Sequence, residues 1–211
     1  MTTELEMLTG IGALMAEYNG VENYPHIREK LAWLVMYSEA VDIISKASCL
    51  YCEKEPDSEF VYPNTVYINT AKYMFADNYH QATKIVQDIC GGITATIPTY
   101  RDWMNPETHP LLEKYLGGKA SVPTEYRLRV ARLLKDLTHS HFQVGTIHGE
   151  GSLSAQRIFL YMSANWEKYK AAAKKAAAIR GWEGETTYGS LPDYPSCISS
   201  KLWPIDTSYK L

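Results

Sequence analysis

Two short glycine-containing segments hold the residues best suited to chemistry in this chain of 211 residues. The first is Gln87-Asp-Ile-Cys-Gly-Gly-Ile93, and the second is His148-Gly-Glu-Gly-Ser152. Glycine leaves the main chain bare, so exposed amides at such a turn allow a large planar or phosphorylated ligand to approach closely. The spacing also fits a simpler hypothesis, in which Gly91 and Gly92 end a helix in the left-handed conformation. Both interpretations place a turn at a helix end.

The second segment contains an imidazole and a carboxylate, His148 and Glu150, ahead of a predicted helix. These groups are typical of proton transfer, and a helix N-terminus favours a carbonyl or phosphate group. The alternative is structural, because Glu150 and Ser152 are also suited to cap the helix that follows. The residue types therefore predict His148 and Glu150 as catalytic residues, with capping as the competing hypothesis.

The stretch from Gly91 to about Pro106 lacks a helical pattern and is rich in aromatic residues. Connections of this length are often functional. Its threonines complete a predicted cofactor-binding set, which consists of Gln87, Gly91, Gly92, Thr94 and Thr96.

The positions of apolar residues, prolines and glycines predict an all-α chain. The expected helices span about residues 3–18, 24–53, 65–90, 109–116, 121–144 and 152–178. Four long helices joined by turns indicate an up-and-down four-helix bundle with an extra N-terminal helix, over residues 1–181. The remainder, residues 182–211, is rich in proline and aromatic residues. We expect it to be an irregular, extended tail that packs on the bundle or on a neighbouring subunit.

The composition limits the class of protein. With 45% apolar and 21% charged residues, the chain has enough material for a hydrophobic core and predicts one domain. The net charge is −3 and the basic residues are not clustered, which argues against a nucleic-acid partner. No apolar run has the length of a membrane span, and the first residues lack the pattern of a secretory signal. These features predict a cytoplasmic protein without a membrane partner.

The cysteines and histidines outside the two glycine segments predict no metal site. Cys49-Leu-Tyr-Cys52 has the spacing of a redox or metal motif, but one pair supplies only half of a tetrahedral site. Because a free cysteine behaves as a small apolar residue, we interpret the pair as packing residues within a helix. His139 and His141 are expected on different faces of a helix, which argues against joint ligation of a metal.

Several motifs, taken in their order along the chain, resemble one enzyme family. They are Ala16-Glu-Tyr-Asn-Gly-Val21, Asn78-Tyr-His80, Gln87-Asp-Ile-Cys-Gly-Gly92, Thr96-Ile-Pro98, Lys114-Tyr-Leu116, Arg132-Leu-Leu-Lys-Asp-Leu-Thr138 and His148-Gly-Glu-Gly-Ser-Leu-Ser-Ala-Gln156. Together they look like the C-terminal helical domain of the 4-hydroxybutyryl-CoA dehydratase (vinylacetyl-CoA isomerase) family. That family is grouped with the flavin-dependent 4-hydroxyphenylacetate 3-hydroxylases, and its fold is similar to that of acyl-CoA dehydrogenases. The resemblance runs from about residue 8 to residue 179.

The resemblance implies a helical bundle that assembles as a homo-oligomer, a dimer or tetramer, and shares FAD with a partner chain or neighbouring subunit. In this family, the residues that match Gln87, Gly91 and Gly92 approach the FAD. The dehydratases also hold a 4Fe-4S cluster, but the His-x6-Cys pair expected ahead of the first helix has no counterpart here, and the cluster ligands are expected in a partner that supplies the N-terminal and middle domains. The dehydratase has a catalytic glutamate near His148. If that glutamate lies a few residues earlier, this chain has Gly145 or Thr146 in its place.

Three functions follow as hypotheses. The first is the C-terminal component of an FAD-dependent 4-hydroxybutyryl-CoA dehydratase or vinylacetyl-CoA isomerase that acts on acyl-CoA and is inactive alone. The second is a component of a flavin-dependent monooxygenase similar to 4-hydroxyphenylacetate 3-hydroxylase. The third is a non-catalytic helical module for oligomerisation.

Overall fold

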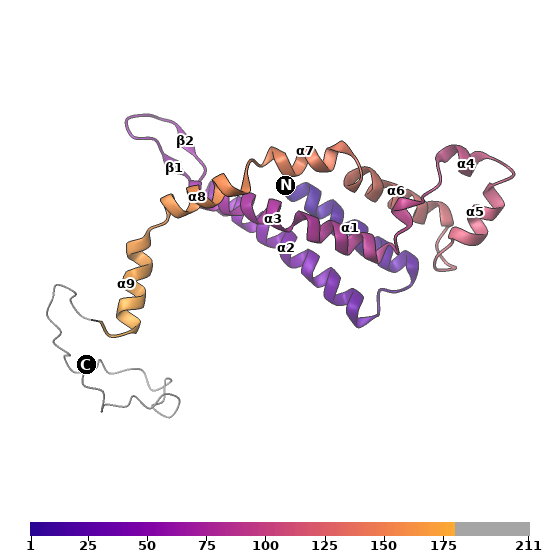
Figure 1. Ribbon diagram of the computed structural model, residues 1–211, viewed down its shortest axis with the longest axis horizontal. Coiled ribbons are helices and arrows are strands. Elements are labelled where there is room, and N and C mark those ends of the chain that lie inside the picture. The colour runs from indigo at the N-terminus through magenta and orange to yellow at the C-terminus, as the bar shows by residue number, and fades with distance from the viewer. Residues whose placement is uncertain (180–211) are drawn as a thin grey trace, which may run out of the picture. The chain divides into compact units, whose positions relative to one another are not determined.

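Three long helices form the frame of the protein in the computed structural model, which describes residues 1–179. These helices are α1 (Thr2–Asn19), α2 (Pro25–Leu50) and α3 (Thr65–Ile89), and they pack side by side (Figure 1). Pro25 stands in the first turn of α2, where its missing N–H has no helical partner to lose. Asn64 begins α3, because its side chain accepts a hydrogen bond from the amide of Tyr67.

The hydrophobic core lies where α1, α2 and α3 meet the later helix α6 (Thr124–Thr138). Its fully buried side chains include Leu8, Met15, Leu34, Val41, Phe75, Val86 and Leu134. Two tyrosines in this core keep their hydroxyls bonded. Tyr37 donates to the carbonyl oxygen of Phe75 at 2.5 Å, and Tyr79 donates to Oε1 of the buried Glu4 at 2.5 Å. The all-helical fold predicted from the sequence is confirmed.

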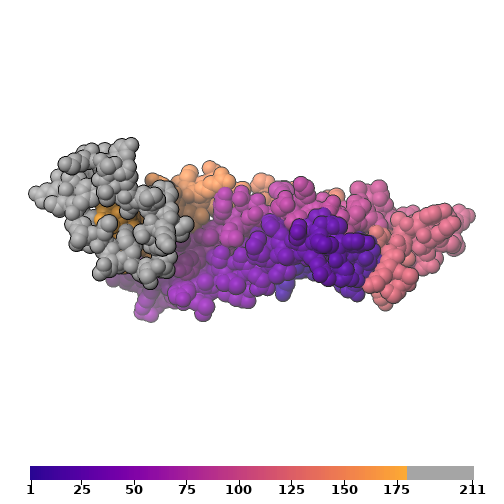
Figure 2. Space-filling view, turned by 90° about the horizontal axis from the view of Figure 1, so that it is seen from below, coloured from indigo at the N-terminus to yellow at the C-terminus, as the bar shows by residue number. Residues whose placement is uncertain are grey.

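The segment between α3 and α6 is more ordered than the sequence predicts. It contains a 3₁₀ turn, η1 (Ile93–Ala95), and a short helix, α4 (Tyr100–Met104), which the sequence did not predict, and then α5 (His109–Leu116), which has the predicted bounds. A capping box begins α4, where Thr99 and Asp102 bond each other's main-chain amides. The α4–α5 segment extends past the ends of the frame helices in two perpendicular views (Figures 1 and 2). It lies close to the start of α6.

The predictions of one continuous helix over residues 121–144 and another over residues 152–178 are wrong, because each of these segments is broken into two helices. The first divides into α6 and α7 (His141–Gly149), and the second divides into α8 (Leu153–Ser163) and α9 (Trp166–Ala176). The cause is local. Ser140 accepts a bond from the amide of Phe142, and Asn165 accepts one from the amide of Lys168, so each side chain begins a new helix.

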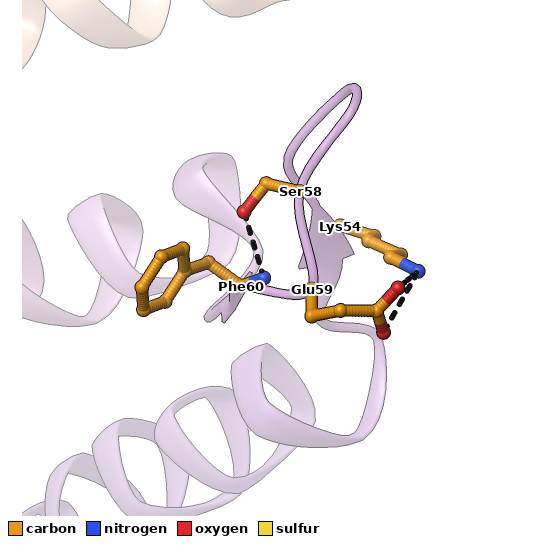
Figure 3. A network of polar contacts seen from close by, with 4 residues as sticks. All are labelled: Lys54, Ser58, Glu59 and Phe60. Carbon is orange, nitrogen blue, oxygen red and sulfur yellow. Dashed lines mark hydrogen bonds and ion pairs between the residues drawn. The ribbon is translucent and has the colours of Figure 1, made fainter.

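A small β-hairpin follows α2, which ends at Leu50 and not near residue 53 as predicted. Its strands β1 (Glu53–Lys54) and β2 (Val61–Tyr62) pair antiparallel, with Glu53 opposite Tyr62. Lys54 bonds both oxygens of the Glu59 carboxylate at 3.2 and 3.3 Å, and the hydroxyl of Ser58 accepts from the amide of Phe60 (Figure 3). The ring of Phe60 points away from the Lys54–Glu59 pair and is 76% exposed.

The described residues fall into two units, residues 1–164 and a second unit that begins at residue 165. The first unit holds the frame, the hairpin and helices α4 to α8, and the described part of the second unit contains α9. The predicted tail, residues 182–211, lies outside the described residues, as does the predicted boundary at residue 181. Within residues 1–179, no helix has the length and apolar character of a membrane-spanning segment.

Candidate functional site

The predicted glycine turn closes the C-terminal end of α3. Gly91 and Gly92 have φ angles of 69° and 74°, the left-handed region that glycine adopts without steric cost. Their amides are not bare, because Gly91 donates to the carbonyl of Asp88 at 2.9 Å and Gly92 donates to that of Gln87 at 3.3 Å. The expectation of exposed amides is therefore wrong, and the capping alternative describes how these N–H groups are used.

The space over the glycine turn is nevertheless open. A Cβ atom built on Gly91 or Gly92 would meet no atom within 4 Å beyond the chain neighbours, and both residues are exposed. What the turn presents is thus an open stretch of main chain without side chains. This surface suits a planar group that packs against the backbone.

The other predicted cofactor-binding residues differ in their accessibility. Gln87 is half-buried, and its side-chain amide donates to the hydroxyl of Thr138 on α6 at 3.3 Å. Thr96 is exposed, whereas Thr94 is 2% exposed. Gln87 and Thr96 are therefore available beside the glycine turn, while Thr94 belongs to the packed interior.

A pocket of 380 Å³ lies between the segment after η1 and the N-terminal half of α6. Its apolar lining includes Ile97 and Leu128, which are nearly buried, together with Pro98 and Trp103. Arg132 reaches the carbonyl of Pro98 at 3.5 Å, a weak bond at the long end of the hydrogen-bond range. Sequence reasoning noted the aromatic stretch and the Arg132 motif but did not bring them together, because they are separated along the chain.

The polar rim of this pocket carries an ion pair. Arg129 bonds Oε1 of Glu125 with two nitrogen atoms, at 2.6 and 3.0 Å, from one helical turn to the next. Arg132 has no carboxylate within ion-pair distance among residues 1–179. The pocket therefore holds one arginine that is neutralised and one that is not.

The second predicted segment forms the turn between α7 and α8. His148 is exposed in the last turn of α7, Glu150 is partly exposed just after it, and Ser152 caps α8 by accepting from the amide of Ala155. The side-chain amide of Gln156 donates to the carbonyl of Glu150, and its Oε1 atom is buried without a hydrogen-bond partner within the described part of the chain. The capping role expected for Ser152 is confirmed.

The two glycine segments lie at different levels of α3. α7 starts after Thr138, beside Gln87, and α8 is held to α3 farther back, where Arg157 bonds the hydroxyl of Tyr73 at 3.0 Å and approaches Asp77 at 3.7 Å. At a rise of 1.5 Å per residue, Asp77 and Gln87 are about 15 Å apart along the helix. The turn that carries His148 thus lies along the side of α3, away from Gly91 (Figure 1).

The cysteine pair is placed differently from our interpretation. Cys49 and Cys52 are both exposed, with Cys49 in the last turn of α2 and Cys52 beyond the end of that helix, so they are not packing residues. Among the cysteines that the structure describes, Cys90 is the buried one, and burial raises its pKa from 9.0 to about 12. His139 ends α6 and His141 begins α7, so the two do not share one helix. No group of three or more His, Cys, Asp or Glu side chains suited to a metal occurs in residues 1–179.

The frame helices, the glycine turn at the end of α3 and the helices that return along it define a helical domain of the acyl-CoA dehydrogenase C-terminal type. Residues 1–178 match the family model described as 4-hydroxyphenylacetate 3-hydroxylase C terminal. The chain therefore belongs to this family.

Relatives in this family catalyse more than one reaction. The chain is 27% identical to 4-hydroxybutyryl-CoA dehydratase/vinylacetyl-CoA-Δ-isomerase of Clostridium aminobutyricum, over 83% of this chain and 38% of that enzyme. It is 30% identical to the oxygenase component of 4-hydroxyphenylacetate 3-monooxygenase of Thermus thermophilus, over 67% of this chain and 29% of that protein. The chain thus spans well under half the length of these relatives.

Solved structures agree with the fold. An oxygen-tolerant archaeal 4-hydroxybutyryl-CoA dehydratase from N. maritimus superposes with a TM-score of 0.74 at 29% identity, over 94% of this chain and 39% of that one. A 4-hydroxyphenylacetate 3-monooxygenase oxygenase component complexed with FAD and 4-hydroxyphenylacetate gives a TM-score of 0.74 at 28% identity, over 84% of this chain and 38% of that one. Enzymes named for both reaction types therefore contain this helical domain, and the monooxygenase component among them binds FAD.

Proposed function

We propose that this chain supplies one wall of an FAD site in an enzyme similar to 4-hydroxybutyryl-CoA dehydratase/vinylacetyl-CoA isomerase, and that a partner polypeptide supplies the remaining walls and the cluster ligands. The observation that carries this proposal is the open, side-chain-free turn at Gly91 and Gly92, with Gln87 fixed beside it. The dehydratase is favoured over other relatives because similarity to it extends over more of the chain, 83% against 67% for the monooxygenase component.

The chemistry of the turn indicates which part of FAD it receives. The amides of Gly91 and Gly92 are used by the helix end, so they offer no N–H groups to a phosphate. The C-terminal end of α3 also carries a partial negative charge, which disfavours an anion. The residues present therefore fit the planar ring of the cofactor better than its diphosphate. The ring packs against the bare glycines, and the half-buried Gln87 orients its edge.

FAD supplies the electron transfer in such enzymes, and the protein supplies binding and orientation. For this chain, we assign His148 and Glu150 to proton transfer at the substrate, since both are accessible at the turn before α8. The distance of this turn from Gly91 along α3 means that the two segments contact different parts of the ligands or different subunits.

Assembly with further chains is part of the proposal. Met36, Ile43 and Leu50 recur every seven residues on α2 and are each at least 60% exposed. Exposed apolar rows of this kind are typical of surfaces that pack against another chain. They support a homo-oligomer, a dimer or tetramer, that also binds the partner with the N-terminal and middle domains.

A monooxygenase component is the second proposal. It is favoured by the higher identity to the Thermus oxygenase component, 30%. It is also favoured if the dehydratase glutamate belongs a few residues before His148, because this chain has Gly145 or Thr146 there. An assembly of this kind would take a phenol as its substrate in place of an acyl-CoA.

The test is flavin retention in the native assembly. The tagged chain is isolated from its own cells under mild conditions with the proteins that assemble with it, and FAD per chain is measured from its absorbance after gel filtration. Gly91→Leu should lose most of the flavin, because the added side chain occupies the open face. Gly91→Ala is the matched control, because it has the same backbone strain at positive φ and little bulk.

Equal FAD in Gly91→Leu and the wild type contradicts the assignment of the turn. A colourless wild-type assembly contradicts the flavin proposal as a whole and favours an oligomerisation module. Assays of the wild-type assembly with 4-hydroxybutyryl-CoA, and with 4-hydroxyphenylacetate plus reduced flavin and oxygen, decide between the two reactions.

A further inference from the structure

We propose that the pocket between α4 and α6 binds a small carboxylic acid with an apolar body. Its carboxylate pairs with Arg132, and its body lies against Ile97, Leu128 and Trp103. This ligand is separate from the proposed FAD, and the pocket is built entirely from residues of this chain.

The shape of the pocket suits a ligand of this size. Its volume of 380 Å³ is within the range of small-molecule sites, which begins at about 300 Å³. Ile97 and Leu128 are 7% and 8% exposed, so they form a firm apolar base. Trp103 has its ring held on the outer side by His109, with ring centroids 4.3 Å apart and Nδ1 of His109 bonded to the Trp103 carbonyl at 2.9 Å. The base of the pocket and the Trp103 side are thus each supported by contacts within this chain.

The charged residues that line the pocket favour a ligand with a single negative charge. Glu125 and Arg129 cancel each other through their two short hydrogen bonds, which leaves one net positive charge on Arg132. Arg132 is partly buried, and its side chain donates a long hydrogen bond of 3.5 Å to the Pro98 carbonyl. A guanidinium has five N–H donors in a planar fork that matches a carboxylate. A nucleotide diphosphate has more negative charge than this pocket balances, and the Glu125 carboxylate would repel it.

The proposal is tested with the full chain and a defined probe. Binding of 3-phenylpropionate is measured by isothermal titration calorimetry, alongside its uncharged amide, 3-phenylpropionamide. The acid should bind saturably at one site, and the amide should bind about tenfold or more weakly, since the carboxylate forms charge-assisted hydrogen bonds. Arg132→Gln should weaken binding of the acid by a similar factor and leave the amide nearly unchanged.

A second variant, Glu125→Gln, is expected to strengthen binding of the acid, an effect that misfolding does not produce. Glu125→Gln removes the partner of Arg129 and the nearest negative charge, so the acid should bind several-fold more tightly. Circular dichroism checks that each variant keeps its helical content. Equal affinity for the acid and its amide, no effect of Arg132→Gln, weaker binding by Glu125→Gln, or no saturable binding by the wild type would each overturn the proposal.

Discussion

At the scale of single residues, one buried hydrogen bond connects the first turn of the chain to its central helix. The hydroxyl of Tyr79 on α3 donates to the carboxylate of Glu4 on α1, and both residues are buried. Desolvation and the neighbouring Glu4 raise the pKa of Tyr79 above its ordinary value, so its hydroxyl remains a donor. Without this donor, the buried oxygen of Glu4 would lose its bonded partner.

We therefore expect Tyr79→Phe to lower the free energy of unfolding by about 1–3 kcal/mol, the cost of a buried polar group left without its hydrogen bond. The measurement is urea denaturation followed by circular dichroism. Tyr62→Phe, a change of the same atoms at an exposed site in the hairpin, should stay within about 0.5 kcal/mol of the wild type. Equal losses in the two variants would show that the bond to Glu4 contributes nothing.

Residue types predicted the location of the glycine turn but not the use of its atoms. Gly91 and Gly92 follow an apolar helical pattern, so a helix end there follows from the sequence. Whether their amides face a ligand or the helix carbonyls depends on two dihedral angles, which composition does not fix. The contact of Arg132 with the Pro98 carbonyl was also beyond prediction, because the two residues are 34 positions apart in the sequence.

At the scale of elements, the α5–α6 connection docks closely on the end of α1. The amide of Lys119 donates to the carbonyl of Tyr18 at 2.7 Å, and a Cβ atom on Gly118 would lie 2.1 Å from that same oxygen. The contact holds because residue 118 has no side chain. It fixes the start of α6, and with it one wall of the proposed carboxylate pocket.

Gly118→Ala should thus destabilise the protein by about 3 kcal/mol, because the added methyl group meets main-chain atoms that have no room to move. Gly10→Ala is the opposite case. Nothing lies within 4 Å of a Cβ at this exposed position within α1, so the variant should gain about 0.5–1 kcal/mol from helix propensity. Thermal unfolding should give a lower melting temperature for Gly118→Ala and a higher one for Gly10→Ala than for the wild type. An unchanged melting temperature for Gly118→Ala would contradict the close docking.

The elements themselves were predicted with uneven success. Helices α1, α3 and α5 begin and end within a residue or two of their predicted bounds, since glycine, proline and asparagine mark their ends. The breaks at Ser140 and Asn165 were missed because the apolar pattern continues across them. Ser140 and Asn165 could each stand within a helix or cap the start of one, and the sequence does not distinguish the two roles. The structure shows that both side chains are caps.

At the scale of the whole molecule, the core formed by residues 1–179 includes three buried groups whose pKa values are raised, Cys90, Tyr37 and Tyr79. Burial raises the pKa of Cys90 from 9.0 to about 12, and it raises the pKa values of Tyr37 and Tyr79 above their usual 10.0. All three groups are neutral when protonated, so the folded protein disfavours their ionised forms. Their contribution to stability is complete below about pH 9 and is lost as the pH rises, because the unfolded chain releases these protons first.

The free energy of unfolding should therefore fall between about pH 9 and pH 11, by at most about 1.4 kcal/mol per pH unit for each group. Urea titrations across this range provide the measurement. Tyr37→Phe should reduce the slope, since one of the three groups is then absent, whatever its effect on stability at neutral pH. A flat profile in the wild type would mean that these groups ionise equally in both states.

The connections between consecutive helices after residue 138, which we call joints, also bear on how the length of the chain can vary within this fold. Ser140, Ser152 and Asn165 each begin the next helix with one side-chain bond of their own. Lengthening or shortening the chain at one joint then risks about 1 kcal/mol, the worth of a single cap, and leaves the other joints intact. A change of chain length at one joint is therefore tolerated only where the following helix keeps its packing, as α8 does on α3 through Arg157 and Tyr73.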